Sequence, residues 1–254
     1  MAEERIPALV VRDLRKVYGA KAAVDGLNLT VERGTFFGFL GPNGAGKSTT
    51  IRMLTGLIPP TSGSVELLGL PMPGGALEVK RRIGLVPDES LLFDRLTGGE
   101  FLEFVGRMYG LARPLARERG AELLALFELD GAGRKLIAEY SKGMRKRVAM
   151  AAALIHGPEL FLMDEPFEGV DAVGARLMKD ILTEQVRQGN TIFLTSHVLE
   201  VVERLCDRVA IIHEGKIVIE GSMDELRTDA RDTLEDVFVR VVGAGRTYEL
   251  PEWL

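Results

Sequence analysis

The chain has 254 residues, of which 46% are hydrophobic and 27% charged, a composition typical of a folded globular protein. Lysine and arginine total 32 against 37 acidic residues, and the net charge of −5 argues against wholesale binding to nucleic acid or to an anionic membrane surface. A single cysteine, Cys206, excludes an intramolecular disulfide and a cysteine-based zinc site, and it suits a reducing compartment.

The longest stretches without a charged residue, residues 34–46 and 53–65, are each 13 residues long. A membrane-spanning helix needs about 20 apolar residues, so neither stretch predicts one. The acidic first residues lack the basic and apolar regions of a signal peptide. We therefore expect a soluble, cytoplasmic protein.

The first third of the chain is rich in predicted strands. Alternating β-branched residues predict strands over residues 8–17 and 26–32. The wholly apolar run FFGFL, residues 36–40, predicts a strand buried on both faces, as in a parallel sheet covered by helices. A helix over residues 46–57 and a strand over residues 64–68 follow.

Helical periodicity replaces the strands from about residue 92 to residue 155. Helices are predicted over residues 100–109, 117–127 and 143–155. We interpret this region as a helical subdomain inserted into an α/β core.

The α/β pattern resumes after this insertion. The predicted elements are a strand at 159–163, a helix near 173–187, a strand at 191–195, and two strands at 209–213 and 216–219 joined by a Glu-Gly hairpin turn. One or two short helices are expected after residue 222.

Residues 41–48 (GPNGAGKS) match the phosphate-binding pattern G-x-x-x-x-G-K-[ST] without a mismatch. Glycines between a buried strand and a helix let backbone N–H groups converge on phosphate oxygens, where the helix dipole is positive. We expect Lys47 to reach the β- and γ-phosphates and the Ser48 hydroxyl to bind Mg²⁺. The alternative is a glycine-rich turn that only joins strand to helix. The predicted nucleotide-binding residues of this segment are Gly41, Pro42, Asn43, Gly44, Ala45, Gly46, Lys47, Ser48 and Thr49.

Two carboxylates follow the apolar run LFLM at residues 160–163. A buried strand that ends in Asp164 places an oxygen ligand at the carboxyl edge of the sheet, where α/β proteins bind their ligands. We expect Asp164 to hold Mg²⁺ through water and Glu165 to take a proton from water that attacks the γ-phosphate. Taken alone, such a pair more often marks a solvated turn.

With these two motifs in place, the chain resembles the ATP-binding subunit of ABC transporters over nearly all of residues 8–221. Residues 140–144 (YSKGM) stand where that family has its LSGGQ signature, 23 residues before Asp164 when counted from Ser141. Residues 169–171 match the family's D-loop, which ends in Asp171. The resemblance implies that Ser141, Gly143 and Asp171 contact ATP.

Two further positions fit the same family. His197 stands at its switch histidine and is expected to donate to the γ-phosphate, and Tyr18 occupies the place of the aromatic residue that stacks on adenine. The alternatives are a structural histidine and a tyrosine that only packs in a strand. His156 and His213 have no such support and are expected to be structural.

The resemblance also implies how the subunit works. The signature would meet the γ-phosphate of ATP bound by a second nucleotide-binding subunit, so ATP is sandwiched between two subunits, and a homodimer is the simpler expectation. An ordinary helix cap is the alternative for Ser141.

The sequence departs from the family at two places. Lys142 replaces a glycine and Met144 replaces the glutamine of the signature, while Ser141 and Gly143 remain. The glutamine of the Q-loop aligns with Asp88, whose carboxylate only accepts hydrogen bonds. We place Asp88 with Ser48 and Asp164 among the residues expected at the metal.

We therefore predict an α/β fold: a P-loop NTPase core of mainly parallel sheet, an N-terminal antiparallel β subdomain and an inserted helical subdomain. Residues 8–221 form the cassette, with the insertion at about 92–157, and residues 222–254 a short helical tail. The predicted function is hydrolysis of ATP, with Mg²⁺, to drive transport through a separate transmembrane permease. These departures, together with residues 234–238 of the tail (LEDVF), resemble cassettes that energise export through separate permeases, and this resemblance implies export without selecting the substrate.

This function places the protein on the inner face of the cell membrane, without a nucleic acid partner. The alternatives are a soluble ABC ATPase that acts on ribosomes or DNA, and a P-loop kinase or GTPase.

Overall fold

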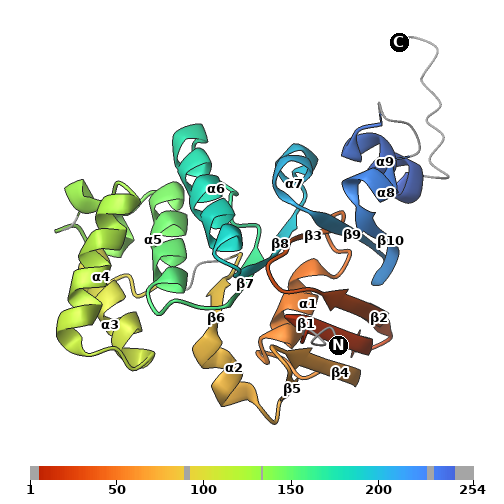
Figure 1. Ribbon diagram of the computed structural model, residues 1–254, viewed down its shortest axis with the longest axis horizontal. Coiled ribbons are helices and arrows are strands. Elements are labelled where there is room, and N and C mark those ends of the chain that lie inside the picture. Colours follow the sequence, from red (N-terminus) through yellow and green to blue (C-terminus); the bar gives the residue numbers. More distant parts are fainter. Residues whose placement is uncertain (1–5, 89–91, 133, 228–231, 244–254) are drawn as a thin grey trace, which may run out of the picture.

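The computed structural model describes residues 6–88, 92–132, 134–227 and 232–243. In this part of the chain, strands form a four-stranded sheet with the order β2-β1-β4-β5 and a six-stranded sheet with the order β10-β9-β3-β8-β7-β6. Figure 1 shows the two sheets side by side, with α3 and α4 at the end of the molecule away from the antiparallel sheet and α5 between these helices and the parallel sheet. The arrangement has the predicted α/β class, with one antiparallel and one mainly parallel sheet.

The four-stranded sheet is antiparallel throughout. Its strands are β1 (Leu9–Tyr18), β2 (Lys21–Val31), β4 (Ser62–Leu67) and β5 (Leu70–Met72). β2 begins five residues earlier than predicted, because Lys21 and Ala22 pair with the end of β1 across a tight turn. Pairing across the turn outweighs the low strand propensity of alanine there.

The six-stranded sheet holds the carboxyl edge at which a ligand is expected. β3 (Phe36–Leu40), β6 (Ile83–Val86), β7 (Leu160–Asp164), β8 (Thr191–Ser196) and β9 (Arg208–His213) run parallel, and β10 (Lys216–Ser222) pairs with β9 antiparallel. Every residue of β3, β7 and β8 is buried. These strands therefore read as apolar runs, as expected for a sheet covered on both faces.

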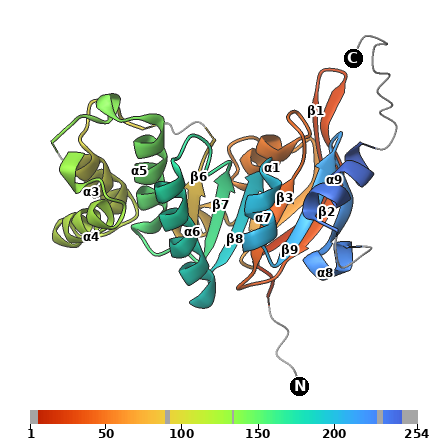
Figure 2. The same ribbon diagram turned by 90° about the horizontal axis from the view of Figure 1, so that it is seen from above.

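The helices lie on both sides of this sheet. They are α1 (Lys47–Leu54), α2 (Ala76–Arg82), α3 (Gly98–Met108), α4 (Arg113–Leu126), α5 (Lys142–Leu154), α6 (Ala172–Arg187), α7 (Leu199–Leu205), α8 (Met223–Leu226) and α9 (Leu234–Val242). α1 ends three residues before the predicted boundary, since Gly56 adopts a φ of 70°. α3, α4 and α5 occupy the predicted helical region, and they cluster at one end in the view of Figure 2. The predicted tail lies partly outside the described residues, which include α8 and α9.

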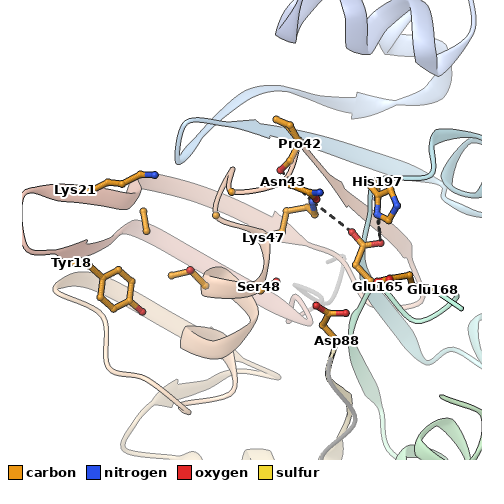
Figure 3. Close-up of a pocket in the computed structure, with 14 residues that line it drawn as sticks. Tyr18, Lys21, Pro42, Asn43, Lys47, Ser48, Asp88, Glu165, Glu168 and His197 are labelled. Carbon is orange, nitrogen blue, oxygen red and sulfur yellow. Dashed lines mark hydrogen bonds and ion pairs between the residues drawn. The ribbon is translucent and has the colours of Figure 1, made fainter. Parts of the chain in front are cut away.

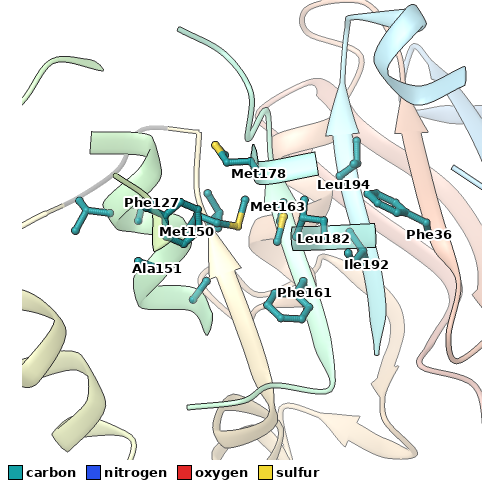
Figure 4. Close-up of a cluster of buried hydrophobic side chains, with 14 of the residues drawn as sticks. Phe36, Phe127, Met150, Ala151, Phe161, Met163, Met178, Leu182, Ile192 and Leu194 are labelled. Carbon is teal, nitrogen blue, oxygen red and sulfur yellow. The ribbon is translucent and has the colours of Figure 1, made fainter. Parts of the chain in front are cut away.

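Buried side chains of the parallel sheet form one hydrophobic cluster on each face. Phe36, Phe161 and Ile192 pack against α5 and α6 on one face, where Figure 4 shows Met150 and Leu182 among them. Their neighbours in sequence, including Phe37, Leu162 and Phe193, pack toward α1 and the antiparallel sheet. Because side chains alternate along a strand, each strand contributes to both clusters.

Gly38 shows how closely a helix approaches this sheet. A Cβ atom added there would lie 2.6 Å from Val202 Cγ1 in α7, so only glycine allows α7 to pack on the middle of β3. Among the described residues, none of the helices combines the length and the apolar character that crossing a bilayer requires.

Candidate active site

A pocket of about 660 Å³ opens at the carboxyl edge of the parallel sheet. Its walls come from the β1–β2 turn, the β3–α1 loop, the start of α1 and the segments after β6, β7 and β8 (Figure 3). The residues that line it are Tyr18, Lys21, Ala23, Pro42, Asn43, Gly44, Gly46, Lys47, Ser48, Thr49, Asp88, Glu165, Glu168 and His197. The pocket thus contains most of the predicted site residues.

The β3–α1 loop forms one wall and depends on its glycines. Gly46 caps α1 with a φ of 115°, and a Cβ atom there would lie 2.5 Å from the carbonyl oxygen of Ala23. A Cβ atom on Gly41 would lie 2.3 Å from the carbonyl oxygen of Ile212. These contacts explain glycine at both positions. No side chain of the residues that the structure describes caps the start of α1, so the N–H groups of its first turn are available to an anion.

Lys47 lies under this loop and is only 6% exposed. Its Nζ donates to the carbonyl oxygens of Gly41, at 2.7 Å, and Pro42, at 3.4 Å. The Nζ also lies 3.6 Å from Glu165 Oε1. The ammonium group is therefore held between the loop and the carboxylate that faces it. Gly41 and Ala45 belong to the loop but do not line the pocket.

The end of β7 forms the opposite wall. Asp164 is 4% exposed, and its Oδ1 accepts a hydrogen bond of 2.6 Å from the Thr195 hydroxyl in β8. The Thr195 oxygen in turn accepts from the Glu165 backbone N–H at 3.2 Å. Asp164 consequently lies just behind the residues that line the pocket. Thr195 was not predicted as a site residue, and its position within an apolar strand gives little signal for one.

Glu165 joins two of the other predicted residues. Its Oε2 lies 3.0 Å from His197 Nδ1 and accepts from the His197 backbone N–H at 3.3 Å. Figure 3 shows the Glu165 side chain between Lys47 and His197. Lys47, Glu165 and His197, the three predicted catalytic residues, are thus brought together by β3, β7 and β8. A carboxylate between an ammonium group and an imidazole can accept a proton from water nearby.

Two further carboxylates line the same end of the pocket. Burial raises the pKa of Asp88, with Asp164, Glu168 and Glu165 adding to the effect and Lys146 opposing it. The pKa of Glu168 is lowered, mainly because its carboxylate accepts a hydrogen bond of 2.7 Å from Lys142 Nζ. Glu168 was missed by the sequence reasoning, although it lies only three residues after Glu165.

Tyr18 lies at the other end of the pocket, away from the carboxylates (Figure 3). Its side chain is 52% exposed, and Lys16 Nζ lies 5.2 Å from the ring centroid. Lys21, another residue that was not predicted, lines this end as well. An exposed aromatic face beside two lysines suits a flat heterocycle with phosphates attached.

Ser141, Gly143 and Asp171 do not line this pocket. Ser141 Oγ caps α5 by accepting from the Met144 N–H at 3.2 Å, and Asp171 Oδ1 caps α6 by accepting from the Gly174 N–H at 2.9 Å. Gly143 packs against the loop before Asp171, since a Cβ atom there would lie 3.2 Å from the Gly169 carbonyl oxygen. The structure therefore brings these residues together with one another, outside the chain's own pocket.

A glycine loop between a buried strand and a helix, a lysine under that loop and an acidic pair at the end of a parallel strand define a P-loop nucleoside triphosphatase. The family model described as ABC transporter matches residues 24–168, more than half of the chain, and the chain belongs to that family.

Relatives narrow the class further. The chain is 41% identical over 236 residues to the daunorubicin resistance ATP-binding protein DrrA3 of Streptomyces coeruleorubidus, covering 93% of this chain and 75% of the relative. It is 41% identical over 224 residues to the bacitracin transport ATP-binding protein BcrA of Bacillus licheniformis, covering 88% and 72%.

The solved structures to which the chain is similar belong to the same class of protein. An ATP-binding subunit of an ABC transporter matches with a TM-score of 0.86 and 31% identity, covering 92% of this chain and 99% of that one. A dimeric ATP-binding cassette in a post-hydrolysis state, bound to ADP and phosphate, matches with a TM-score of 0.79 and 25% identity, covering 85% and 98%. The chain is an ATP-binding subunit of the ABC transporter family and an ATPase, which confirms the family and the fold predicted from the sequence.

Proposed function

We propose that this subunit powers export through a separate membrane permease and that it hydrolyses ATP between two paired subunits. The position of the signature residues carries the proposal. Ser141 and Asp171 are exposed, and with Gly143 they lie outside the chain's own pocket. If these residues contact a phosphate, as the resemblance to the family implies, the nucleotide must be held by another subunit.

Within the pocket, the loop from Gly41 to Thr49 binds the triphosphate through its N–H groups, with Lys47 facing the β- and γ-phosphates. Tyr18 lies at the other end of the pocket, where we expect it to stack on the base. In this proposal, the loop at one end of the pocket and Tyr18 at the other set the orientation of ATP.

Mg²⁺ would be held by Ser48, Asp164 and Asp88, and it would neutralise charge on the phosphates. Among the described residues there is no group of three or more histidine, cysteine, aspartate or glutamate side chains that could hold a metal ion. This donor set fits Mg²⁺, which is commonly bound by one or two carboxylates together with water and substrate phosphates.

Glu165 serves as the general base in this proposal. It accepts the proton of the attacking water, while the contacts of its Oε2 with His197 orient the carboxylate. The His197 side chain is 47% exposed, and when it turns to donate to the γ-phosphate, the backbone N–H of His197 still holds Glu165 Oε2. The site is completed when Ser141 and Gly143 of a second subunit approach from the open side.

Export and the permease partner are supported by the relatives. Their names refer to daunorubicin resistance, bacitracin transport and Nod factor export. We propose the same class of function here, with the subunit on the inner face of the membrane and the permease near the Asp88 loop and the helical insertion. Two copies of this chain are the simplest pair, and no nucleic acid partner is required.

The test uses Glu165→Gln, because glutamine keeps the size of the base but cannot accept the proton. Hydrolysis should fall by about 10²–10⁴-fold, the usual contribution of a general base. Lys47, the glycine loop and Asp164 are untouched, so ATP should stay bound. We expect a stable ATP-dependent dimer on size-exclusion chromatography with light scattering.

Ser141→Arg is the matched second change, since it adds bulk and charge at the surface offered to the other subunit. Added to Glu165→Gln, it should abolish the dimer while ATP binding to the monomer persists. A Glu165→Gln protein that stays monomeric at saturating ATP would contradict the paired arrangement. Wild-type hydrolysis by Glu165→Gln would remove Glu165 as the base.

A further inference from the structure

Lys146 is a buried cation between α5 and the pocket. The residue is 2% exposed, although lysine is rarely buried without partners. Its Nζ donates to the carbonyl oxygens of Asp88 at 2.6 Å, Pro87 at 3.2 Å and Asp164 at 3.5 Å. Burial lowers the pKa of Lys146, and the charges of Asp88, Glu168 and Asp164 oppose this shift. The surroundings of the ammonium group are thus the acidic end of the nucleotide site.

The three carbonyl groups lie at the carboxyl ends of two neighbouring strands, two of them just after β6 and one at the last residue of β7. β6 and β7 pair from Ile83 with Leu160 to Val86 with Met163. Pro87 and Asp88 follow the last paired residue of β6, and Asp164 ends β7. Within the described residues, the main chain at Asp88 therefore has no strand pairing to hold it, and its position depends on other contacts. Lys146 supplies two of these contacts, to the carbonyl oxygens of Pro87 and Asp88.

Lys146 also connects this edge to the helix that carries the signature. α5 begins after Ser141, five residues earlier, and lies beside β6 and β7 (Figure 1). Lys142 precedes Lys146 by four residues on the same helix and binds Glu168 at 2.7 Å. Residues four apart lie on one helix face, so this face of α5 directs two lysines toward the acidic end of the pocket.

We propose that Lys146 is a positioning residue that fixes Asp88 relative to Asp164 by binding the main chain of both to α5. The inference rests on the proposed function, in which both carboxylates serve the metal and the γ-phosphate. Lys146 does not line the pocket. It acts through the place of Asp88, and a misplacement of about 1 Å can cost as much as 10²-fold in rate.

The test is a double-mutant cycle of Lys146→Met and Asp88→Asn. Methionine keeps the length of the side chain and removes the charge and the donors. We expect Lys146→Met to lower kcat by about 10- to 100-fold, while the Kd for a fluorescent ATP analogue changes by less than about threefold. If Lys146 acts through Asp88, the double variant should be no slower than the slower single variant.

Arg119→Met is the matched control for loss of a cation bound to the main chain. Arg119 donates to the Ile155 carbonyl oxygen at 2.9 Å, at the far end of α5 and outside the pocket. This variant should lose stability without losing kcat. Circular dichroism establishes that each variant is folded at the assay temperature. If Lys146→Met does not fold, the same double-mutant cycle is measured with Lys146→Gln, because the glutamine side chain is shorter than lysine and also lacks the charge.

Two results would overturn the inference: wild-type kcat in the folded Lys146 variant, or rate losses that multiply in the double variant. Lys47→Ala separates this failure from failure of the proposed site. If Lys47→Ala hydrolyses ATP at the wild-type rate, the assignment of the whole pocket is wrong. If Lys47→Ala is inactive and Lys146→Met is fully active, only the role of Lys146 is wrong.

Discussion

At the scale of single residues, Glu165 combines a functional side chain with an unusual backbone. Its φ is 47°, in the left-handed region that favours glycine. The conformation follows directly after the last residue of β7 and directs the carboxylate toward Lys47 and His197. Such backbone strain costs on the order of 1–3 kcal/mol and occurs often at active sites. Here the strain accompanies the position of the proposed base.

Glu165→Gly and Glu165→Ala should therefore differ in stability. Both lose the carboxylate, but alanine keeps the cost of positive φ. We expect the glycine variant to be more stable by about 1 kcal/mol, which is roughly 2–4 °C in Tm for a chain of this size. Differential scanning calorimetry measures the difference. At Glu184, within α6, the order should reverse because alanine favours a helix. Equal stability of the two Glu165 variants would contradict the strained backbone.

Some of the site could be predicted from the sequence and some could not. Lys47, Glu165 and His197 each stand at the end of a buried strand or in a recognisable loop, so their meeting follows from the topology of a parallel sheet. Lys146 lies within the run RKR at 145–147, and because lysine is rarely buried, the sequence gives no sign that this side chain is enclosed. Only the packing of α5 against β6 and β7 shows that it is buried.

At the scale of elements, long apolar or periodic segments were predicted well. Residues 36–40 form β3 with the predicted bounds. α2, β6 and α7 have seven, four and seven residues and were not predicted. In segments this short, intrinsic preference is weak and tertiary contacts decide the structure. The burial of Val79 and Val202, which stabilises α2 and α7, becomes visible only once the sheet is assembled.

One ion-pair cluster joins several of these elements. Arg82, the last residue of α2, binds Glu159 just before β7 through two contacts of 2.7 Å and 2.9 Å. Arg33, after β2, binds the same carboxylate at 2.9 Å. The hydrogen bond from Arg82 is the main cause that lowers the pKa of Glu159, and Arg33 adds to it. The cluster thus links both sheets to α2.

Glu159→Gln should destabilise the protein in a pH-dependent way. A carboxylate with a lowered folded-state pKa stabilises fully above its unfolded pKa of about 4.3. That contribution is lost as the pH falls through the folded-state value. Because the cluster is partly exposed, we expect a loss of about 1 kcal/mol at pH 7 and convergence with wild type in acid. Urea titrations across pH measure this.

The control for this effect is Asp180→Asn, which removes an exposed pair with Arg176 at 3.2 Å within α6. It should change stability little at any pH, since exposed pairs contribute little. A Glu159→Gln difference that stays constant into acid would show that the carboxylate charge is not its source.

At the scale of the whole molecule, the pocket joins the two sheets. Tyr18 and Lys21 come from the antiparallel sheet, whereas Glu165 and His197 follow strands of the parallel sheet. A nucleotide that fills the pocket would contact both. The pocket is built from segments that lie far apart in the sequence. Local sequence patterns predicted many of the residues that line it, but not the distances between them.

The place of Ser141 outside its own pocket has a consequence for mixtures of two defective proteins. In the proposed pair, each nucleotide site takes its loop from one chain and its signature from the other. Lys47→Ala alone and Ser141→Arg alone leave every site with one damaged half. When the two variants pair with each other, the arginine lies at only one of the two sites, the one that combines both damaged halves, and the other site combines two intact halves.

Mixing two inactive proteins should therefore restore ATPase activity through complementation between subunits. Mixing wild type with a chain that carries both changes should add nothing, because every mixed site then contains one damaged half. Purified variants, mixed in equal amounts and assayed for phosphate release, measure this directly. If the mixture of single variants stays inactive while both proteins remain folded, each chain must complete its own site. If each chain completed its own site, no two inactivating substitutions in different copies could restore activity. In the proposed pair, activity is restored when one substitution damages the loop half of the site and the other damages the signature half.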